Sequence, residues 1–366
     1  ATFPSDTLST LLIQPSGVAA LGRWGVLDDV AASGCPPIDQ YAFDPGPFKL
    51  TGRPLAHDGV RRAFAPRRTV LDKILVDAAV AAGVEVREGF TVEDVLVEDG
   101  TVVGIRGHGE GGQSVVERAR VVVGADGRNS RVAKVVGPET YNDKPVLANA
   151  FYTFWSGLPV DGVHIRLRED RGIASMPTND GLTLVLVGFP ADQAPAFKAD
   201  VEGSYLRSID RDPELAELVR GATREERFAG GGVPNFLRKP YGPGWALVGD
   251  AGYTKDPITA QGISDAFRDA ELCAGALGEA FDGRRPYDDA MAAYHRERDE
   301  HALPIYDVTT HLATFEPPPP ELQQMLAAVH GNQDGMDAFL SVIAGTSTPG
   351  DFVAFAQGLV GDTEAA

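Results

Sequence analysis

Hydrophobic and polar positions in the first third of the chain follow two different periods. Apolar side chains recur at helical spacing over residues 8–30 and over residues 68–82, so both stretches are predicted to be helices. A short strand is expected at residues 84–86. The following stretch alternates between apolar and polar residues between Gly-containing turns, which predicts an antiparallel meander with strands at residues 91–98, 101–106 and 114–118.

The pattern changes after residue 147, where long apolar runs predict a second, mostly antiparallel sheet. Its expected strands cover residues 148–155, 163–168, 172–176 and 182–189. Beyond this sheet, helical spacing dominates and the last forty or so residues are predicted to be helical. The other helices are expected at residues 193–201, 213–220, 261–277 and 287–301.

Two apolar strands are each expected to end in an aspartate. A strand at residues 119–123 leads into Gly124-Ala-Asp126-Gly127, with a helix start near Ser130. A strand at residues 245–248 leads into Gly249-Asp250, a loop with Pro257, and a helix that begins at Gln261-Gly262. In open α/β sheets, ligands bind beyond the carboxyl ends of the strands, and helix N-termini attract negative charge. The alternative for each junction is an ordinary turn whose aspartate caps a helix.

Charge and composition narrow the range of partners. The 366 residues include 33 Lys and Arg against 52 Asp and Glu, a net charge of −19, which disfavours nucleic acids and anionic membranes as partners. The two cysteines are far apart, no metal site is evident, and neither a membrane span nor a signal peptide is visible. We therefore expect a cytoplasmic protein that acts on a small molecule.

The two junctions together resemble motifs of the FAD-dependent monooxygenases of the p-hydroxybenzoate hydroxylase type. The segment from Gly124 to Ser130 is similar to the "DG" motif of that family, and Gly249-Asp250-Ala251 with Pro257 and Gln261-Gly262 is similar to its "GD" motif. Arg68, on a predicted helix, resembles a third landmark. The resemblance implies an α/β fold with an FAD-binding domain, an interrupting antiparallel-sheet substrate domain and a helical C-terminal end. The implied FAD-binding domain comprises residues 1–40, 61–138 and 236–300, the substrate domain residues 41–60 and 139–235, and the C-terminal segment residues 301–366.

The resemblance also implies roles for individual residues. Asp250 would hydrogen-bond the FAD, while Pro257 and Gly262 would lie against the isoalloxazine ring. The helix after Gln261 would direct its N-terminus at the pyrimidine end of the flavin. Asp126 would serve FAD binding and the transient approach of NADPH. The cofactor-binding set implied in this way is Arg68, Asp126, Gly127, Gly249, Asp250, Pro257, Gln261 and Gly262.

The implied reaction is that of a flavin monooxygenase. NAD(P)H would reduce FAD, and O₂ would then be activated to hydroxylate or epoxidise a small aromatic or polyketide-like molecule. No catalytic acid or base can be assigned, because the flavin supplies the chemistry in this family. The sequence departs from the motif at Ala260, where glycine is commoner, and at Ser264-Asp265.

The Gly-x-Gly-x-x-Gly fingerprint that opens this family is not found at the front of the sequence. The one match, Gly107 to Gly112, is flanked by predicted strands and is interpreted as a hairpin loop. We expect that roughly thirty preceding residues are missing, the length of a βαβ start; a natural relative that has lost the fingerprint is the alternative. Two other functions stay open: an FAD-dependent reductase of the geranylgeranyl-reductase type, and a flavin-free, non-catalytic relative that binds a small molecule.

Overall fold

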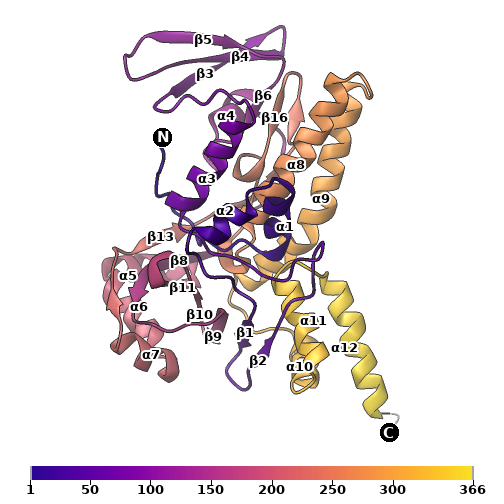
Figure 1. Cartoon of the computed structure of the whole chain (residues 1–366). Coiled ribbons are helices and arrows are strands. Elements are labelled where there is room, and N and C mark those ends of the chain that lie inside the picture. Colours follow the sequence, from indigo (N-terminus) through magenta and orange to yellow (C-terminus); the bar gives the residue numbers. More distant parts are fainter. Residues whose placement is uncertain (1, 365–366) are drawn as a thin grey trace.

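The computed structural model describes residues 2–364 and arranges them in three regions, which Figure 1 shows from top to bottom. A small meander lies at the top, helices and short strands form the middle, and a large sheet lies below with helices beside it. Ala1, in the first expected domain, and residues 365–366, in the expected C-terminal segment, lie outside the described residues.

The large sheet has eight strands in the order β12-β8-β11-β10-β9-β1-β2, and β13 also pairs with β8. Its longest ladder joins β8 and β11 in an antiparallel register from Leu182 opposite Ser156 to Pro190 opposite Ala148. The strand β1 lies parallel to β9, so an early segment of the chain completes this sheet. The strands are β1 (Tyr41–Asp44), β2 (Leu50–Gly52), β8 (Ala148–Ser156), β9 (Val163–Arg168), β10 (Arg171–Pro177), β11 (Leu182–Pro190), β12 (Thr223–Arg224) and β13 (Ala229–Gly232).

Alternation along the strands gives the large sheet two buried faces. On β8, Phe151 and Trp155 pack into a cluster with the helices α5 (Ala194–Ala199), α6 (Val201–Ile209) and α7 (Pro213–Arg220). Tyr152 and Phe154 point to the other face, into a cluster that includes Leu340. That cluster holds residues of the C-terminal helices α10 (Pro320–Val329), α11 (Gln333–Ile343) and α12 (Pro349–Glu364). The C-terminal helices therefore complete the core of the sheet.

A small parallel pair of strands forms the centre of the middle region. The strands β6 (Val122–Gly124) and β16 (Trp245–Leu247) run in the same direction, and β15 (Tyr241–Gly242) pairs with β16. Two long helices, α8 (Gly262–Phe281) and α9 (Tyr287–Leu312), pack against each other, and Tyr294 of α9 joins them to Ala246 of β16. The remaining helices of this region are α1 (Pro15–Arg23), α2 (Leu27–Ala32), α3 (Arg68–Ala81) and α4 (Arg131–Val136).

Two further small sheets frame this centre. The meander consists of β3 (Thr91–Glu98), β4 (Thr101–His108) and β5 (Ser114–Arg118), and the third sheet of β7 (Thr140–Lys144), β14 (Asn235–Arg238) and β17 (Tyr253–Thr254). The expected meander is confirmed, and residues 109–112 form the turn between β4 and β5, as predicted for the Gly-rich match. Among residues 2–364, no helix has the length and apolarity that a membrane crossing requires.

Three expectations about local structure are wrong. Residues 8–14 are not helical, because Ile13 instead forms a β-bridge with Phe64, and the expected helix is further divided at Gly25. Residues 84–86 form no strand, and Val84 is 53% exposed, because no described strand lies beside it to pair. The helix expected at residues 287–301 continues to Leu312 through an internal proline.

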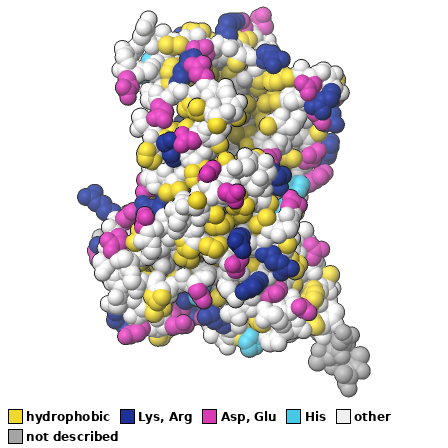
Figure 2. Space-filling view, in the orientation of Figure 1, with side chains coloured by type: hydrophobic (Ala, Val, Ile, Leu, Met, Phe, Trp, Pro, Cys, Tyr) yellow, Lys and Arg dark blue, Asp and Glu magenta, His cyan; other side chains and the backbone are white. Residues whose placement is uncertain are grey.

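Exposed apolar residues mark the upper part of the molecule. Val80, Val84, Val86 and Val123 come from α3, the loop after it and β6. Figure 2 shows hydrophobic side chains gathered on the upper half of one face, with Lys, Arg, Asp and Glu scattered around them. The net negative charge is thus spread over the surface that Figure 2 shows rather than concentrated in one patch.

Candidate functional site

The two predicted strand–aspartate junctions lie side by side. Because β6 and β16 are parallel and Gly124 is paired with Leu247, both strands end at the same edge of the sheet. The loops that carry Asp126 and Asp250 leave from this edge. The sequence predicts each junction separately, and the parallel register of two short strands brings them together.

Asp126 caps the helix that follows it. Its Oδ2 atom accepts hydrogen bonds from the backbone N–H groups of Arg131, at 2.7 Å, and Val132, at 3.4 Å. Gly127, with φ of 75°, makes the turn between the aspartate and the helix in a conformation that favours glycine. The side chain of Asp126 is exposed, so its second oxygen faces solvent-accessible space in the loop.

Asp250 lies in the first turn after β16, beside a small polar pocket. This pocket is lined by Gly249, Asp250, Tyr253, Lys255, Gly262 and Asp265. The Asp250 side chain is exposed, yet the protein around it removes enough water to raise the pKa of its carboxyl, although the nearby cations Lys255, Arg128 and Arg68 lower it. Gly249, with φ of 53°, is buried under this turn.

Arg68 is brought within electrostatic reach of Asp250, although the two are 182 positions apart in the chain. It begins α3 and forms a bidentate pair with Asp72, at 2.7 and 2.9 Å. This ion pair holds the Arg68 guanidinium beside Asp72, one helical turn further along α3. Of the sequence-predicted residues, the fold therefore places Gly249, Asp250 and Gly262 around one pocket, with Arg68 within electrostatic reach of Asp250 and Asp126 on the adjoining loop.

The loop from Lys255 to Gln261 connects β17 to α8 and holds the remaining predicted residues. Pro257 begins a short 3₁₀ turn, Pro257–Thr259, and Ala260 follows with φ of 49°. Gln261 is buried and donates a hydrogen bond from Nε2 to the carbonyl oxygen of Ile343, at 3.3 Å. At Gly262, a Cβ atom would meet no described atom within 4 Å, so the start of α8 faces open space.

A buried ionic network lies behind the polar pocket. The ammonium of Lys255 is paired with Asp265 and donates a hydrogen bond to the Tyr253 hydroxyl at 2.6 Å. Arg268 donates a second charged hydrogen bond to Asp265 at 2.9 Å. Burial raises the pKa of Asp265, but Lys255 and Arg268 outweigh it and hold that pKa below its usual value. Lys255 was not predicted, because a single lysine in a loop carries no motif.

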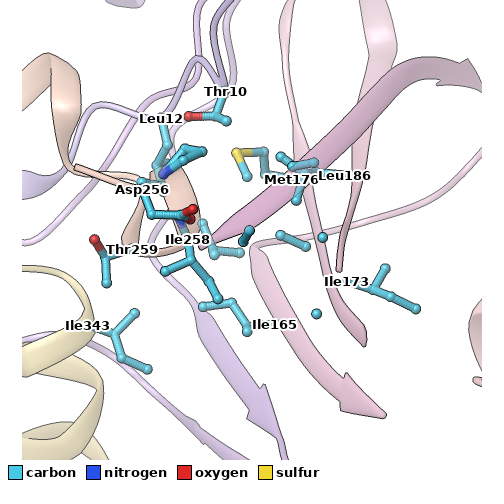
Figure 3. A pocket seen from close by; sticks show the side chains of 18 of the residues that line it. Thr10, Leu12, Ile165, Ile173, Met176, Leu186, Asp256, Ile258, Thr259 and Ile343 are labelled. Carbon is cyan, nitrogen blue, oxygen red and sulfur yellow. The ribbon is translucent and has the colours of Figure 1, made fainter. Parts of the chain in front are cut away.

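A larger, apolar pocket lies on the other side of the same loop, and Figure 3 shows the side chains that line it. It contains about 720 Å³ of space when its open mouth is included. Its walls come from the N-terminal segment (Leu12), the large sheet (Ile165, Met176), the loop (Ile258) and the C-terminal region (Ile343). Pro257 also lines this pocket, so the loop Asp256–Ala260 forms one of its walls.

Asp256 is the acidic residue in the wall of the apolar pocket. Its side chain is 3% exposed, and burial raises the pKa of its carboxyl to about 6, although the backbone amides of Ile258 and Ala148 lower it. The sequence analysis did not predict this residue. The signal available was the Asp-Pro pair that opens the loop between the second junction and its helix.

Comparisons with known proteins agree with this geometry. The model of a family described as "FAD binding domain" matches residues 11–309. Digeranylgeranylglycerophospholipid reductase 1 of Methanopyrus kandleri is 30% identical over 63% of this chain and 61% of its own length. The 6-methylpretetramide 4-monooxygenase of Streptomyces rimosus is 28% identical over 80% of this chain and 72% of its own length.

Among solved structures, the myxobacterial chondrochloren halogenase, described as a variant of FAD-dependent halogenases, has a similar fold. It aligns with a TM-score of 0.78 and 22% identity, over 93% of this chain and 84% of the halogenase. The chain spans between 53% and 61% of the lengths of the first three reductases that it matches.

Proposed function

The chain belongs to the family of FAD binding domains, and from this membership we propose that it acts as a flavin-dependent monooxygenase on a small, mainly apolar molecule. The expected family of FAD-dependent oxidoreductases and the expected α/β fold class are confirmed by the family match and the similar fold. The observation that carries the proposal is the position of one loop, Asp256–Ala260, between a polar pocket at the strand ends and the larger apolar pocket.

The residues at the strand ends suit the binding of FAD. Gly262 leaves open the space that any larger side chain would occupy, so a planar ring can approach the backbone at the start of α8. That helix is 20 residues long, and its N-terminus carries partial positive charge from backbone N–H groups. Asp250 offers an exposed carboxylate to the hydroxyl groups of a bound dinucleotide.

We assign the other predicted residues by their positions. Arg68 provides positive charge toward the Asp250 side of the pocket, and Gly249 allows the tight turn below it. Asp126 and Gly127 shape the adjoining loop, where NAD(P)H would approach. Pro257 and Gln261 fix the loop between the two pockets. FAD, when reduced by NAD(P)H, supplies the activation of O₂.

The apolar pocket would hold the substrate. Its apolar walls disfavour water beside the bound molecule, and its space, the open mouth included, is of the order that a small aromatic or polyketide-like compound needs. The likeness to 6-methylpretetramide 4-monooxygenase supports hydroxylation as the reaction. In this arrangement the protein orients the substrate against the loop, while the strand-end residues hold the cofactor.

A titration with FAD tests the proposal. The purified chain should bind FAD saturably with a perturbed visible spectrum, and NAD(P)H should then be consumed together with O₂. The Asp250→Asn variant should bind FAD at least about tenfold more weakly, because a neutral amide accepts hydroxyl hydrogen bonds less strongly than a carboxylate. Asp77→Asn, an exposed change on α3, serves as the matched control. A folded chain that binds no FAD would contradict FAD binding by these residues alone, and would mean either that the expected preceding βαβ start is needed or that the protein is a flavin-free relative.

A reductase is the second candidate, because digeranylgeranylglycerophospholipid reductase 1 is 30% identical over its matched region. Such an enzyme would reduce a carbon–carbon double bond with electrons from FAD and would not need O₂. Under anaerobic conditions, an unsaturated substrate would reoxidise reduced FAD in a reductase but not in a monooxygenase. This measurement separates the two functions.

A further inference from the structure

The polar groups in the wall of the apolar pocket differ in whether they have partners. The Gln14 side chain accepts a hydrogen bond from the Tyr41 hydroxyl at 2.7 Å, and the Thr259 hydroxyl is bonded to that of Thr309 at 2.9 Å. Asp256 is different, because its Oδ2 atom is buried and has no hydrogen-bond partner among the described residues. A buried carboxyl oxygen without a partner is costly and calls for a specific explanation.

The rest of Asp256 is held firmly. Its Oδ1 atom accepts the backbone N–H of Ile258 at 3.0 Å, which caps the short 3₁₀ turn. Its own backbone N–H donates to Oδ1 of Asn235 at 2.7 Å, and Asn235 donates in turn to the carbonyl of Pro145 at 3.0 Å. Rotation of the carboxyl group would break the cap. Oδ2 is therefore fixed in the pocket wall, and in Figure 3 the carboxyl points from the loop toward the strand side chains.

The surroundings of the Asp256 Oδ2 atom indicate which kind of ligand group could bind to it. No ion pair joins Asp256 to a cation in the described part of the chain; the backbone amide of Ala148 lies near its carboxyl, and the other walls of the pocket are mainly apolar, with Ile165, Met176 and Leu186 among them. An ammonium or guanidinium ligand would lose its hydration in such a pocket, which is far more costly than burying a neutral hydroxyl group. A neutral O–H donor on an apolar body satisfies the carboxylate and the apolar walls together.

We propose that Asp256 is the polar anchor of the apolar pocket, where its carboxylate accepts a hydrogen bond through Oδ2 from the hydroxyl group of an otherwise apolar, phenol-type ligand. The identification of this ligand with the substrate rests on the proposed function. The binding itself can be measured on the chain alone, whose residues form the described wall. Asp256 thereby selects ligands by a hydrogen-bond donor and fixes their orientation.

The test compares two probes on the same ring system, 2-naphthol and 2-methoxynaphthalene, in which a methyl group replaces the donor hydrogen. Isothermal titration of the whole chain at pH 8, with and without FAD, should show that the naphthol binds at least about tenfold more tightly, the range expected for a hydrogen bond to a charged group. Equal affinities of the two probes, or binding of neither, would overturn the inference.

Variants of Asp256 distinguish a role in ligand binding from a purely structural role. Asp256→Asn keeps an oxygen to cap Ile258 but presents an N–H₂ donor to the pocket, so the preference for the naphthol should fall to within about twofold. A ketone acceptor, 2-acetylnaphthalene, should then gain affinity relative to the naphthol, which a merely structural role of Asp256 would not produce. The Asp77→Asn control should keep the wild-type preference. An Asp256→Asn variant that still prefers the naphthol tenfold would refute the anchor.

The outcomes are independent of those of the FAD titration. A chain that prefers the naphthol but binds no FAD would support the anchor and contradict FAD binding by these residues alone. A chain that binds FAD but does not distinguish the two probes would support the flavin site and contradict the anchor.

Discussion

Lys255 and Asp256 are neighbours in the chain, but they face opposite sides of one loop and opposite electrostatic environments. Lys255 points into a buried network in which the Asp265 carboxylate balances its charge, and Arg268 pairs with that same carboxylate. Asp256 points toward an apolar pocket in which no described residue balances its Oδ2 atom. Lys255 thus has its charged partner within the protein, whereas the Oδ2 atom of Asp256 has no hydrogen-bond partner among the described residues. The difference separates a charge that supports the fold from a charge that supports binding.

Removing the buried cation Lys255 should have the largest effect on stability. Lys255→Met leaves Asp265 buried with Arg268 as its remaining partner, so the free energy of unfolding should fall by about 3–5 kcal/mol. Urea denaturation followed by circular dichroism measures this loss. The matched control is Lys73→Met in the exposed pair with Asp77, which should cost less than about 1 kcal/mol. Similar losses in both variants would show that the buried network does not support the fold.

Neutralising Asp256 should raise the free energy of unfolding instead of lowering it, and the size of this gain should depend on pH. The pKa of Asp256 is raised from 3.8 to about 6 in the folded chain, so the folded state binds the extra proton and stability falls as pH rises through this interval. Asp256→Asn avoids that loss. It should be more stable than the wild type by about 3 kcal/mol at pH 8, with the advantage vanishing near pH 4.

Urea midpoints of both proteins at the two pH values measure the change in this advantage. The comparison uses the difference between variant and wild type, since other carboxylates affect both proteins equally. An advantage of equal size at pH 4 and pH 8 would exclude the titration of Asp256 as its cause.

The smallest change in stability is expected at the polar pocket. Gly262→Ala adds a methyl group in open space at the start of α8, so stability should change by less than about 1 kcal/mol. FAD affinity should nevertheless fall, by about tenfold, because the methyl group blocks the approach of a planar ring. A stability curve and an FAD titration of the same sample test both parts.

Gly17→Ala is the contrasting variant for this glycine. At Gly17 a Cβ atom would lie 2.6 Å from the Ser264 hydroxyl oxygen and 2.8 Å from Ile13, so this variant should lose stability. If Gly262→Ala binds FAD as tightly as the wild type, the open space at α8 is not where the ring lies.

Regular periodicity made much of the fold predictable. The antiparallel strands between residues 148 and 189 and the helix from Arg68 were expected because their own side chains set the period. Residues 84–86 show the limit, since their apolar residues match a strand but no described strand lies alongside. A short strand depends on its partner, which a local pattern does not contain.

The candidate site also has parts that the sequence predicts and parts that it does not. The junctions at Asp126 and Asp250 could be predicted because each is a local motif, and a parallel pair of strands then brings them together. The opposite directions of Lys255 and Asp256 could not be predicted, because they depend on which elements lie on each side of the loop. The contact between Gln261 and Ile343 joins residues 82 positions apart, for which the sequence offers no signal.

The apolar pocket is built jointly by both ends of the chain. Thr10 and Ile343, in its walls, are separated by almost the whole sequence, and Ile343 also accepts the hydrogen bond of Gln261 at the start of α8. A protease that trims the chain within α11 would therefore remove a wall of the pocket and the partner of Gln261 in one cut, and would also expose the core that α11 and α12 share with the large sheet. The residues of the two strand–aspartate junctions would remain in such a shortened chain.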